Sequence, residues 1–263
     1  MTDTPEPVLI VDDVGPVRRL TMNRPAALNA LNGGLVDAIS DAVAAGAADP
    51  DVRVMILRGA GRAFCAGYDL NEDAAGGVLD AARWHEDLQR STARMLEIHD
   101  CPKPVIASVR SYCLAGGTDL MLACDLTVAS DDAFFGYVDV RFGSGVVSMF
   151  LPWVIGVRRA KELLFTGEDR IPADEALRIG LVNRVVPVAE LAPTTRALAA
   201  RIAAGPPGAI GLAKALLNRS ATVDLSTSLG FEAYAQAQAI TSEDHAEGVR
   251  AFLEKRAPRF TGA

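Results

Sequence analysis

The pattern of apolar positions divides the chain into a strand-rich first part and a helical end. Segments 8–13 and 17–22 carry β-branched residues on both sides of the dipeptide Gly15-Pro16, which predicts a β-hairpin. Continuous apolar runs predict further strands at 52–57, 104–109, 126–130 and 134–138. Four-residue spacing of apolar side chains predicts helices at 33–45 and 81–99, and an apolar helix follows at about 116–124.

From residue 157 the pattern changes to short helices that each end at a glycine. Segment 182–187 is the last predicted strand, and the chain beyond Pro187 has helical spacing, interrupted at 205–208 and 220–226. Strands that alternate with helices indicate an α/β core with parallel strands. We therefore expect two parts, an α/β core over 1–190 and a helical region over 191–263.

Composition narrows the class of protein. The 263 residues are 50% apolar with a net charge of −7, which indicates a globular protein and argues against a nucleic-acid partner. The four cysteines have no CxxC spacing, which favours buried thiols over disulfides or a zinc site. The N-terminus lacks the basic and apolar regions of a signal peptide, and no apolar run reaches membrane-spanning length, so we expect a cytoplasmic protein.

Two turns rich in small residues each follow a buried strand. The first is RAFCAGYDL (62–70), and the second is SYCLAGGTDLMLACD (111–125), in which Gly116 and Gly117 open the apolar helix. The unpaired N–H groups at a helix start favour an anion or a developing oxyanion. Close packing alone would also explain small residues in one turn. Two such turns favour a site in which one N–H from each binds the same carbonyl oxygen.

These two segments, AFCAGYDL and VRSYCLAGGTDLMLACDLTVAS, resemble the paired signature of the crotonase superfamily, the enoyl-CoA hydratase/isomerase family. Other family-like segments follow in order: TMNRPAALNAL, FTG, EALRIGLVNRVVP and SEDHAEGVRAFLEKRAPRF. The resemblance implies a crotonase-type ββα spiral core with a C-terminal helical trimerisation region. It also implies an acyl-CoA thioester substrate, no metal, no cofactor beyond the coenzyme A of that substrate, and assembly as a trimer or a dimer of trimers.

The resemblance also assigns roles to residues. The backbone N–H groups of Tyr68 and Gly116 would form an oxyanion hole for the thioester, and the carboxylates of Asp119 and Asp139 would handle water and proton. Without the resemblance, Asp119 would be a helix-start aspartate and Asp139 a surface acid. Further residues expected to contact the substrate are Ala27, Leu28, Ala66, Gly67, Asp69, Leu70, Gly117 and Lys255.

The sequence also departs from the family pattern. Hydratases of the family have glutamates where this chain has Asp119 and Asp139, so each carboxylate lies roughly 1.5 Å further back. The PGxGG loop is missing after Asp139, and Ala26 stands where a lysine or arginine is common. A hydratase-type lyase is the favoured function; an isomerase, decarboxylase or hydrolase of the same superfamily, or a non-catalytic acyl-CoA-binding protein, stays open.

The sequence also bears on nucleotide binding and on the acyl group of the substrate. A dinucleotide site at Gly59-Ala60-Gly61 is disfavoured, because the third glycine is absent and no helix begins directly after it. The acyl group is not specified, because the segments expected to line its pocket, 71–84 and 140–153, are those that depart most from the family.

Overall fold

The computed structural model describes residues 6–70, 80–144 and 150–263. Its main sheet has six strands in the order β1-β2-β3-β4-β6-β9. Strands β1 and β2 form an antiparallel hairpin, and each later neighbour pairs in parallel. The strands of this sheet are β1 Leu9–Val14, β2 Val17–Met22, β3 Val54–Gly59, β4 Val105–Val109, β6 Leu126–Ser130 and β9 Arg184–Val186.

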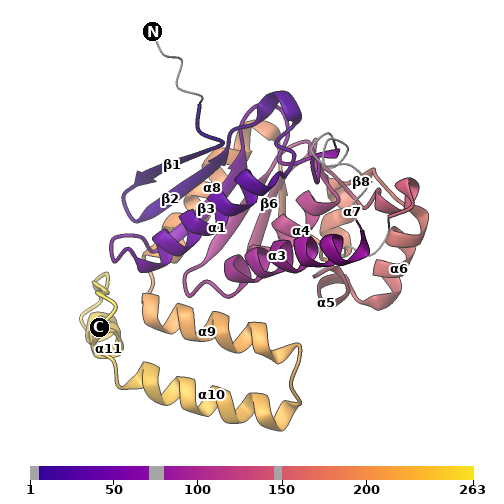
Figure 1. The fold of residues 1–263 in the computed structure, drawn as a ribbon. Helices are drawn as coiled ribbons and strands as arrows, with labels where there is room; N and C mark the ends of the chain where they lie inside the picture. The colour runs from indigo at the N-terminus through magenta and orange to yellow at the C-terminus, as the bar shows by residue number, and fades with distance from the viewer. Residues whose placement is uncertain (1–5, 71–79, 145–149) are drawn as a thin grey trace.

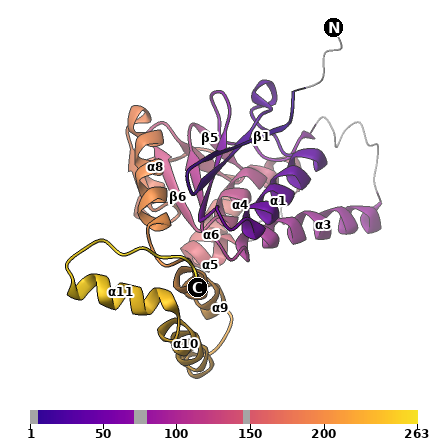
Figure 2. The ribbon, with the colours of Figure 1, turned by 90° about the vertical axis from the view of Figure 1, so that its left-hand side faces the viewer.

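Helices cover both faces of this sheet (Figures 1 and 2), which explains why its central strands are apolar throughout. Alternate residues of β3 face opposite sides: Met55 and Leu57 belong to the cluster that contains α1 (Gly33–Ala48) and α3 (Ala81–His99). Val54 and Ile56 belong to the cluster that contains α8 (Val188–Ala203). The sheet is therefore held between two helical layers.

A second, three-stranded sheet positions the site. It has the order β5-β7-β8, formed by β5 Tyr112–Leu114, β7 Phe134–Gly136 and β8 Ile171–Pro172. Strands β5 and β7 are parallel, and α4 (Gly116–Ala123) begins two residues after β5. Short helices follow at η2 Asp139–Phe142, α5 Leu151–Ile155, α6 Val157–Thr166 and α7 Ala173–Arg178.

The last three helices, α9 Pro207–Ser220, α10 Leu225–Ile240 and α11 Glu243–Leu253, lie together at one end of the molecule (Figure 1). A buried ion pair ties α9 to the core: Lys214 Nζ lies 2.8 Å from Asp125 Oδ2, and the same carboxylate accepts the N–H of Val105. Although most of α8 lies beyond residue 190, this helix packs on the main sheet. We therefore propose that the separate helical region begins at α9.

The predicted α/β architecture is confirmed, with two differences in its strands. The strand expected at 52–57 lies at Val54–Gly59, because Val52 belongs to the turn before it. The second sheet was not predicted, because β5 and β8 have three and two residues and give no periodic signal. All four cysteines are buried free thiols, as the sequence predicts. No helix in the described parts of the chain is long and apolar enough to cross a membrane.

Candidate active site at two strand exits

The first turn, 62–70, is fixed by backbone hydrogen bonds on two sides. Cys65 pairs with Cys113 of β5 as an isolated parallel bridge, and Leu114 N–H donates to the Cys65 carbonyl at 3.0 Å. On the other side Leu31 pairs with Tyr68 in the same way. The segment therefore bridges the 24–31 loop and the strand that leads into α4.

The two turns are in direct contact, and glycines make this contact possible. A Cβ on Gly117 would lie 2.6 Å from the Cys65 carbonyl oxygen, and one on Gly67 would lie 3.0 Å from the Ala115 Cβ. Gly67 also has a φ of 105°, which only glycine adopts readily. The bare backbone that the sequence shows at both turns thus allows the two strand exits to meet.

The two amides assigned to the oxyanion hole lie at this junction. The position that a Gly67 Cβ would occupy is 3.7 Å from the Gly116 nitrogen, so the turn before Tyr68 lies directly against the first residue of α4. Among the described residues, neither the Tyr68 nor the Gly116 N–H donates to a protein acceptor. The helix dipole adds partial positive charge at Gly116. This arrangement suits a carbonyl oxygen on which negative charge develops.

The Tyr68 side chain lies over the same place. A Cβ on Gly116 would come within 2.5 Å of the tyrosine ring, so the ring packs on the Gly116 backbone. Its hydroxyl is 2.8 Å from Ser91 Oγ of α3, and the side chain is half-buried. Burial raises the pKa of the Tyr68 phenol, and the charges of Asp119 and Asp139 raise it further. Both carboxyl groups therefore lie within electrostatic range of this ring.

Asp119 lies in the first turn of α4, and its side chain is completely buried. One carboxylate oxygen, Oδ1, accepts a hydrogen bond of 2.9 Å from the phenol of Tyr137. Tyr137 follows β7 and is itself 1% exposed. Its pKa is raised well above the ordinary value, first by burial and then by Asp119, so the phenol keeps its proton and remains a donor.

Asp139 begins the short helix η2, two residues after Tyr137. It is half-buried, and its Oδ2 is a buried oxygen that has no hydrogen-bond partner in the described parts of the chain. Burial raises the pKa of this carboxyl group. A buried acceptor without a partner is uncommon in native proteins, and it indicates an oxygen that binds water or a ligand.

Most of the residues expected to contact the substrate lie around the first turn. The Ala66 N–H donates to the carbonyl of Leu28, which has a left-handed φ of 51° next to Ala27. Asp69 is buried and forms an ion pair of 2.7 Å with Arg24. Leu70 is 58% exposed at the edge of this group.

The acyl-pocket segments and Lys255 were also expected to belong to the site. Half of the residues in the pocket segments 71–84 and 140–153, namely 71–79 and 145–149, lie outside the described residues. Helix α11 lies apart from α4 within the chain (Figure 2), and Lys255 comes two residues after the end of this helix.

The sequence analysis missed three residues of this arrangement: Arg24, Ser91 and Tyr137. Arg24 precedes the proline of the NRPAALNAL segment. It could have been found as the cation for Asp69, because Ala27 and Leu28 of this segment and Asp69 of the first turn were all expected to contact the substrate. Ser91 and Tyr137 gave no signal, because a single hydroxyl in a helix or at a strand end is ordinary in any sequence.

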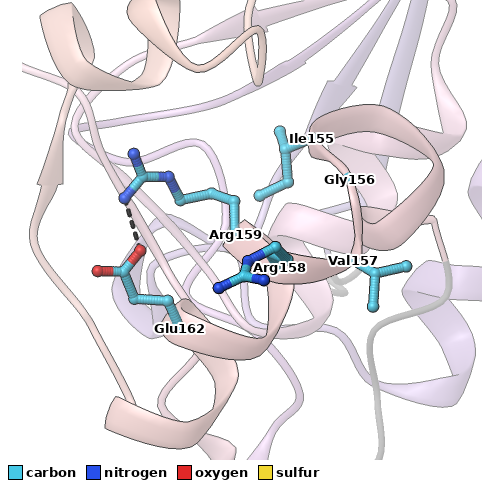
Figure 3. A pocket seen from close by; sticks show the side chains of 6 residues that line it. All are labelled: Ile155, Gly156, Val157, Arg158, Arg159 and Glu162. Carbon is cyan, nitrogen blue, oxygen red and sulfur yellow. Dashed lines mark hydrogen bonds and ion pairs between the residues drawn. The ribbon is translucent and has the colours of Figure 1, made fainter.

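Other places in the described residues fit a ligand less well. A surface hollow of about 680 Å³ between α5 and α6 contains Arg158 and Arg159, and Figure 3 shows Arg159 directed at Glu162, its ion-pair partner at 2.6 Å. That carboxylate neutralises the cation that would otherwise attract an anion. Among the residues that the structure describes, no group of three or more His, Cys, Asp or Glu is placed to hold a metal ion.

Comparison with known proteins adds an independent line of evidence. The family model described as enoyl-CoA hydratase/isomerase matches residues 14–263. The chain is 37% identical to the short-chain-enoyl-CoA hydratase of Clostridium acetobutylicum, over 94% of this chain and 95% of that protein. It is 38% identical to the crotonyl-CoA hydratase of Syntrophomonas wolfei, over 92% of this chain and 93% of that protein.

Solved structures agree with these relatives. The enoyl-CoA hydratase of Mycobacterium smegmatis superposes with a TM-score of 0.90 at 36% identity, covering 97% of this chain and 99% of that one. A putative enoyl-CoA hydratase of Streptomyces coelicolor gives a TM-score of 0.91 at 34% identity, covering 100% and 98%. The predicted fold class is therefore confirmed.

Proposed function

The chain belongs to the enoyl-CoA hydratase/isomerase family, and we propose that it adds water to the double bond of an enoyl-CoA thioester, or removes it in the reverse direction. The observation that carries this proposal is the contact between the two strand exits. This contact supports an oxyanion hole made of the Tyr68 and Gly116 amides, since neither N–H donates to an acceptor among the described residues.

Addition of water to the β-carbon places negative charge on the thioester oxygen as an enolate forms. Two N–H donors aimed at that oxygen would stabilise the enolate, by about 3 kcal/mol for each donor in comparable sites. Each 1.4 kcal/mol corresponds to about a tenfold change in rate, so the pair would account for about four orders of magnitude.

We assign different roles to the two carboxyl groups. Asp119 would act as the base toward the attacking water, because the Tyr137 hydroxyl donates to its carboxylate and so favours the charged form. Asp139 would deliver the proton to the α-carbon, because burial raises its pKa and one of its oxygens is free to face the substrate. Two acids with different surroundings are a common basis for such a division of roles.

The coenzyme A part of the substrate would lie along the first turn. Residues Ala66, Gly67 and Gly117 offer a backbone with little side-chain bulk, and the loop with Ala27 and Leu28 lies beside it. The Leu70 side chain would cover the edge of this surface. No cofactor other than the coenzyme A of the substrate is part of this proposal.

We further propose a homo-oligomer, a trimer or a dimer of trimers. Large apolar side chains of the helical region are exposed in the single chain, as is uncommon for a monomer. The most exposed are Leu217 at 67%, Leu225 at 74%, Tyr234 at 66%, Phe252 at 82% and Leu253 at 73%. In such an assembly Lys255 would act on a neighbouring subunit's coenzyme A. Light scattering of the purified protein measures the assembly directly.

The function is tested by following the absorbance of the conjugated thioester of crotonyl-CoA and of longer enoyl-CoA substrates. We expect the absorbance to decay and a 3-hydroxyacyl-CoA product to form. Tight acyl-CoA binding without decay for any chain length would refute the hydratase proposal. Product analysis then separates the other candidates: a shifted double bond identifies an isomerase, loss of carbon dioxide a decarboxylase, and free coenzyme A a hydrolase.

A non-catalytic acyl-CoA binder is distinguished by two variants. In an enzyme, Asp119→Asn and Asp139→Asn lower kcat by at least about a hundredfold, because each removes a proton-transferring group. In a binder, the affinity for acyl-CoA is the same for both variants as for the wild type, and there is no turnover to lose.

A further inference from the structure

The hydroxyl of Tyr137 donates a hydrogen bond to the carboxylate of Asp119. The two residues are far apart in sequence, one on α4 and one after β7, and both are almost completely buried. A carboxylate without water around it depends on protein donors to remain charged. The hydrogen bond from Tyr137 therefore helps to keep the Asp119 carboxylate charged.

The backbone holds Tyr137 in place from two sides. Its own N–H donates to the Glu168 carbonyl at 2.8 Å, and the preceding carbonyl, that of Gly136, accepts the Ala115 N–H at 2.8 Å. The same carbonyl accepts the hydroxyl of Thr118 at 3.2 Å. The end of β7 is thus bonded directly to the start of α4, and this fixes the phenol relative to the helix that carries Asp119.

Two neighbouring titratable groups that interact electrostatically with Asp119 are the Tyr68 phenol and the Cys113 thiol. Burial raises the pKa of both, so both are neutral at ordinary pH. Asp139 also interacts with Tyr137, and in its charged form Asp139 would repel the charge of Asp119 rather than stabilise it. Of these neighbouring groups, the Tyr137 hydroxyl stabilises the charged Asp119 carboxylate through a direct hydrogen bond.

We propose that Tyr137 is a positioning residue for Asp119: its hydroxyl holds one carboxylate oxygen and so sets the direction in which this short side chain meets the attacking water. The inference rests on the proposed function of Asp119 as the base. It gives a reason why an aspartate works at this position. A fixed donor restricts the carboxylate to one direction, so that less of its time is spent in orientations that face away from the water.

The test is Tyr137→Phe, which removes one oxygen atom and keeps the ring. We expect kcat for enoyl-CoA hydration to fall about 10- to 100-fold, the loss that corresponds to one hydrogen bond to a charged group, with KM unchanged. The acid limb of the pH profile should move to higher pH, because the charged form of the base loses a donor. Tyr112→Phe on the neighbouring strand β5 is the matched control, and it should keep the wild-type kcat.

The double variant decides whether Tyr137 acts through Asp119. When Tyr137→Phe is added to Asp119→Asn, it should cost no further activity, because the group it positions has already been changed. A full additional loss in the double variant would overturn the proposal. An equal loss of kcat in Tyr112→Phe would also overturn it, because the effect would then be a general loosening of the small sheet.

A measurement without turnover separates this inference from the proposed function. In protein with ¹³C-labelled tyrosine, the ring resonance of Tyr137 should shift more in Asp119→Asn than in Asp139→Asn. This experiment leaves Tyr137 itself unchanged. If the wild type hydrates no enoyl-CoA and the resonance still moves, the contact stands and the proposed function fails. If the wild type is active and neither this resonance nor the kcat of Tyr137→Phe changes, the positioning role is refuted.

Discussion

Gly117→Ala tests the contact on which the whole site depends. The new Cβ would lie 2.6 Å from the Cys65 carbonyl oxygen and 2.9 Å from the Cys65 sulfur, whereas ordinary contacts begin near 3.4 Å. The start of α4 and the first turn would have to separate by about 0.8 Å, the difference between 3.4 and 2.6 Å. The Cys65 carbonyl cannot swing away freely, because it accepts the Leu114 N–H.

A displacement of that size at a reacting centre costs about a hundredfold in rate, or about 2.7 kcal/mol of activation free energy. We expect kcat/KM on crotonyl-CoA to fall by about that factor and the melting temperature to fall by a few degrees, as is typical of overpacking. Gly34→Ala is the control, because its Cβ would meet nothing closer than 3.9 Å. A Gly117→Ala enzyme with kcat/KM within twofold of the wild type would refute the argument that this contact forms the oxyanion hole.

Two further variants test the charges. Asp139→Asn should abolish hydration but raise the melting temperature at pH 8, because burial raises the pKa of Asp139 and the folded state then loses stability as pH rises through that pKa. The gain should vanish toward pH 4, and a lower melting temperature at pH 8 would contradict this reasoning. Lys214→Met should lower the melting temperature by about 10 °C, because it leaves Asp125 buried without its cation. Lys214→Met/Asp125→Asn, which removes both charges, should recover part of the loss; if the single variant melts like the wild type, the ion pair is not what anchors α9.

The sequence predicted the main sheet well, because its strands are long, apolar and separated by clear helices. It placed the two glycine turns correctly after buried strands, since the strand-to-helix transition leaves a clear pattern of small residues. The presence of two such turns suggested that they meet, and the resemblance strengthened this expectation. Spacing along the chain says nothing about which loops meet in space, and here the meeting depends on pairing between Cys65 and Cys113 in a bridge of a single residue pair.

The surroundings of the two acids were beyond the sequence for a different reason. The pattern identifies Asp119 and Asp139 as candidates, but their protonation depends on burial and on donors from other elements. The Tyr137 hydroxyl reaches Asp119 from the end of a three-residue strand that belongs to an unpredicted sheet. The sequence assigned a role only to the N–H of Tyr68, whereas its ring also packs on the Gly116 backbone.

Helix α10 buries no side chain within one chain, although Leu225, Leu229 and Tyr234 are large and apolar. A helix of 16 residues is only marginally stable in water by itself, and α10 is supported here mainly by α9. Most of the free energy that orders it must therefore come from association with another surface. Dilution should loosen this end of the molecule well before the α/β core melts, so that protein concentration, rather than temperature alone, sets how much of the chain is ordered.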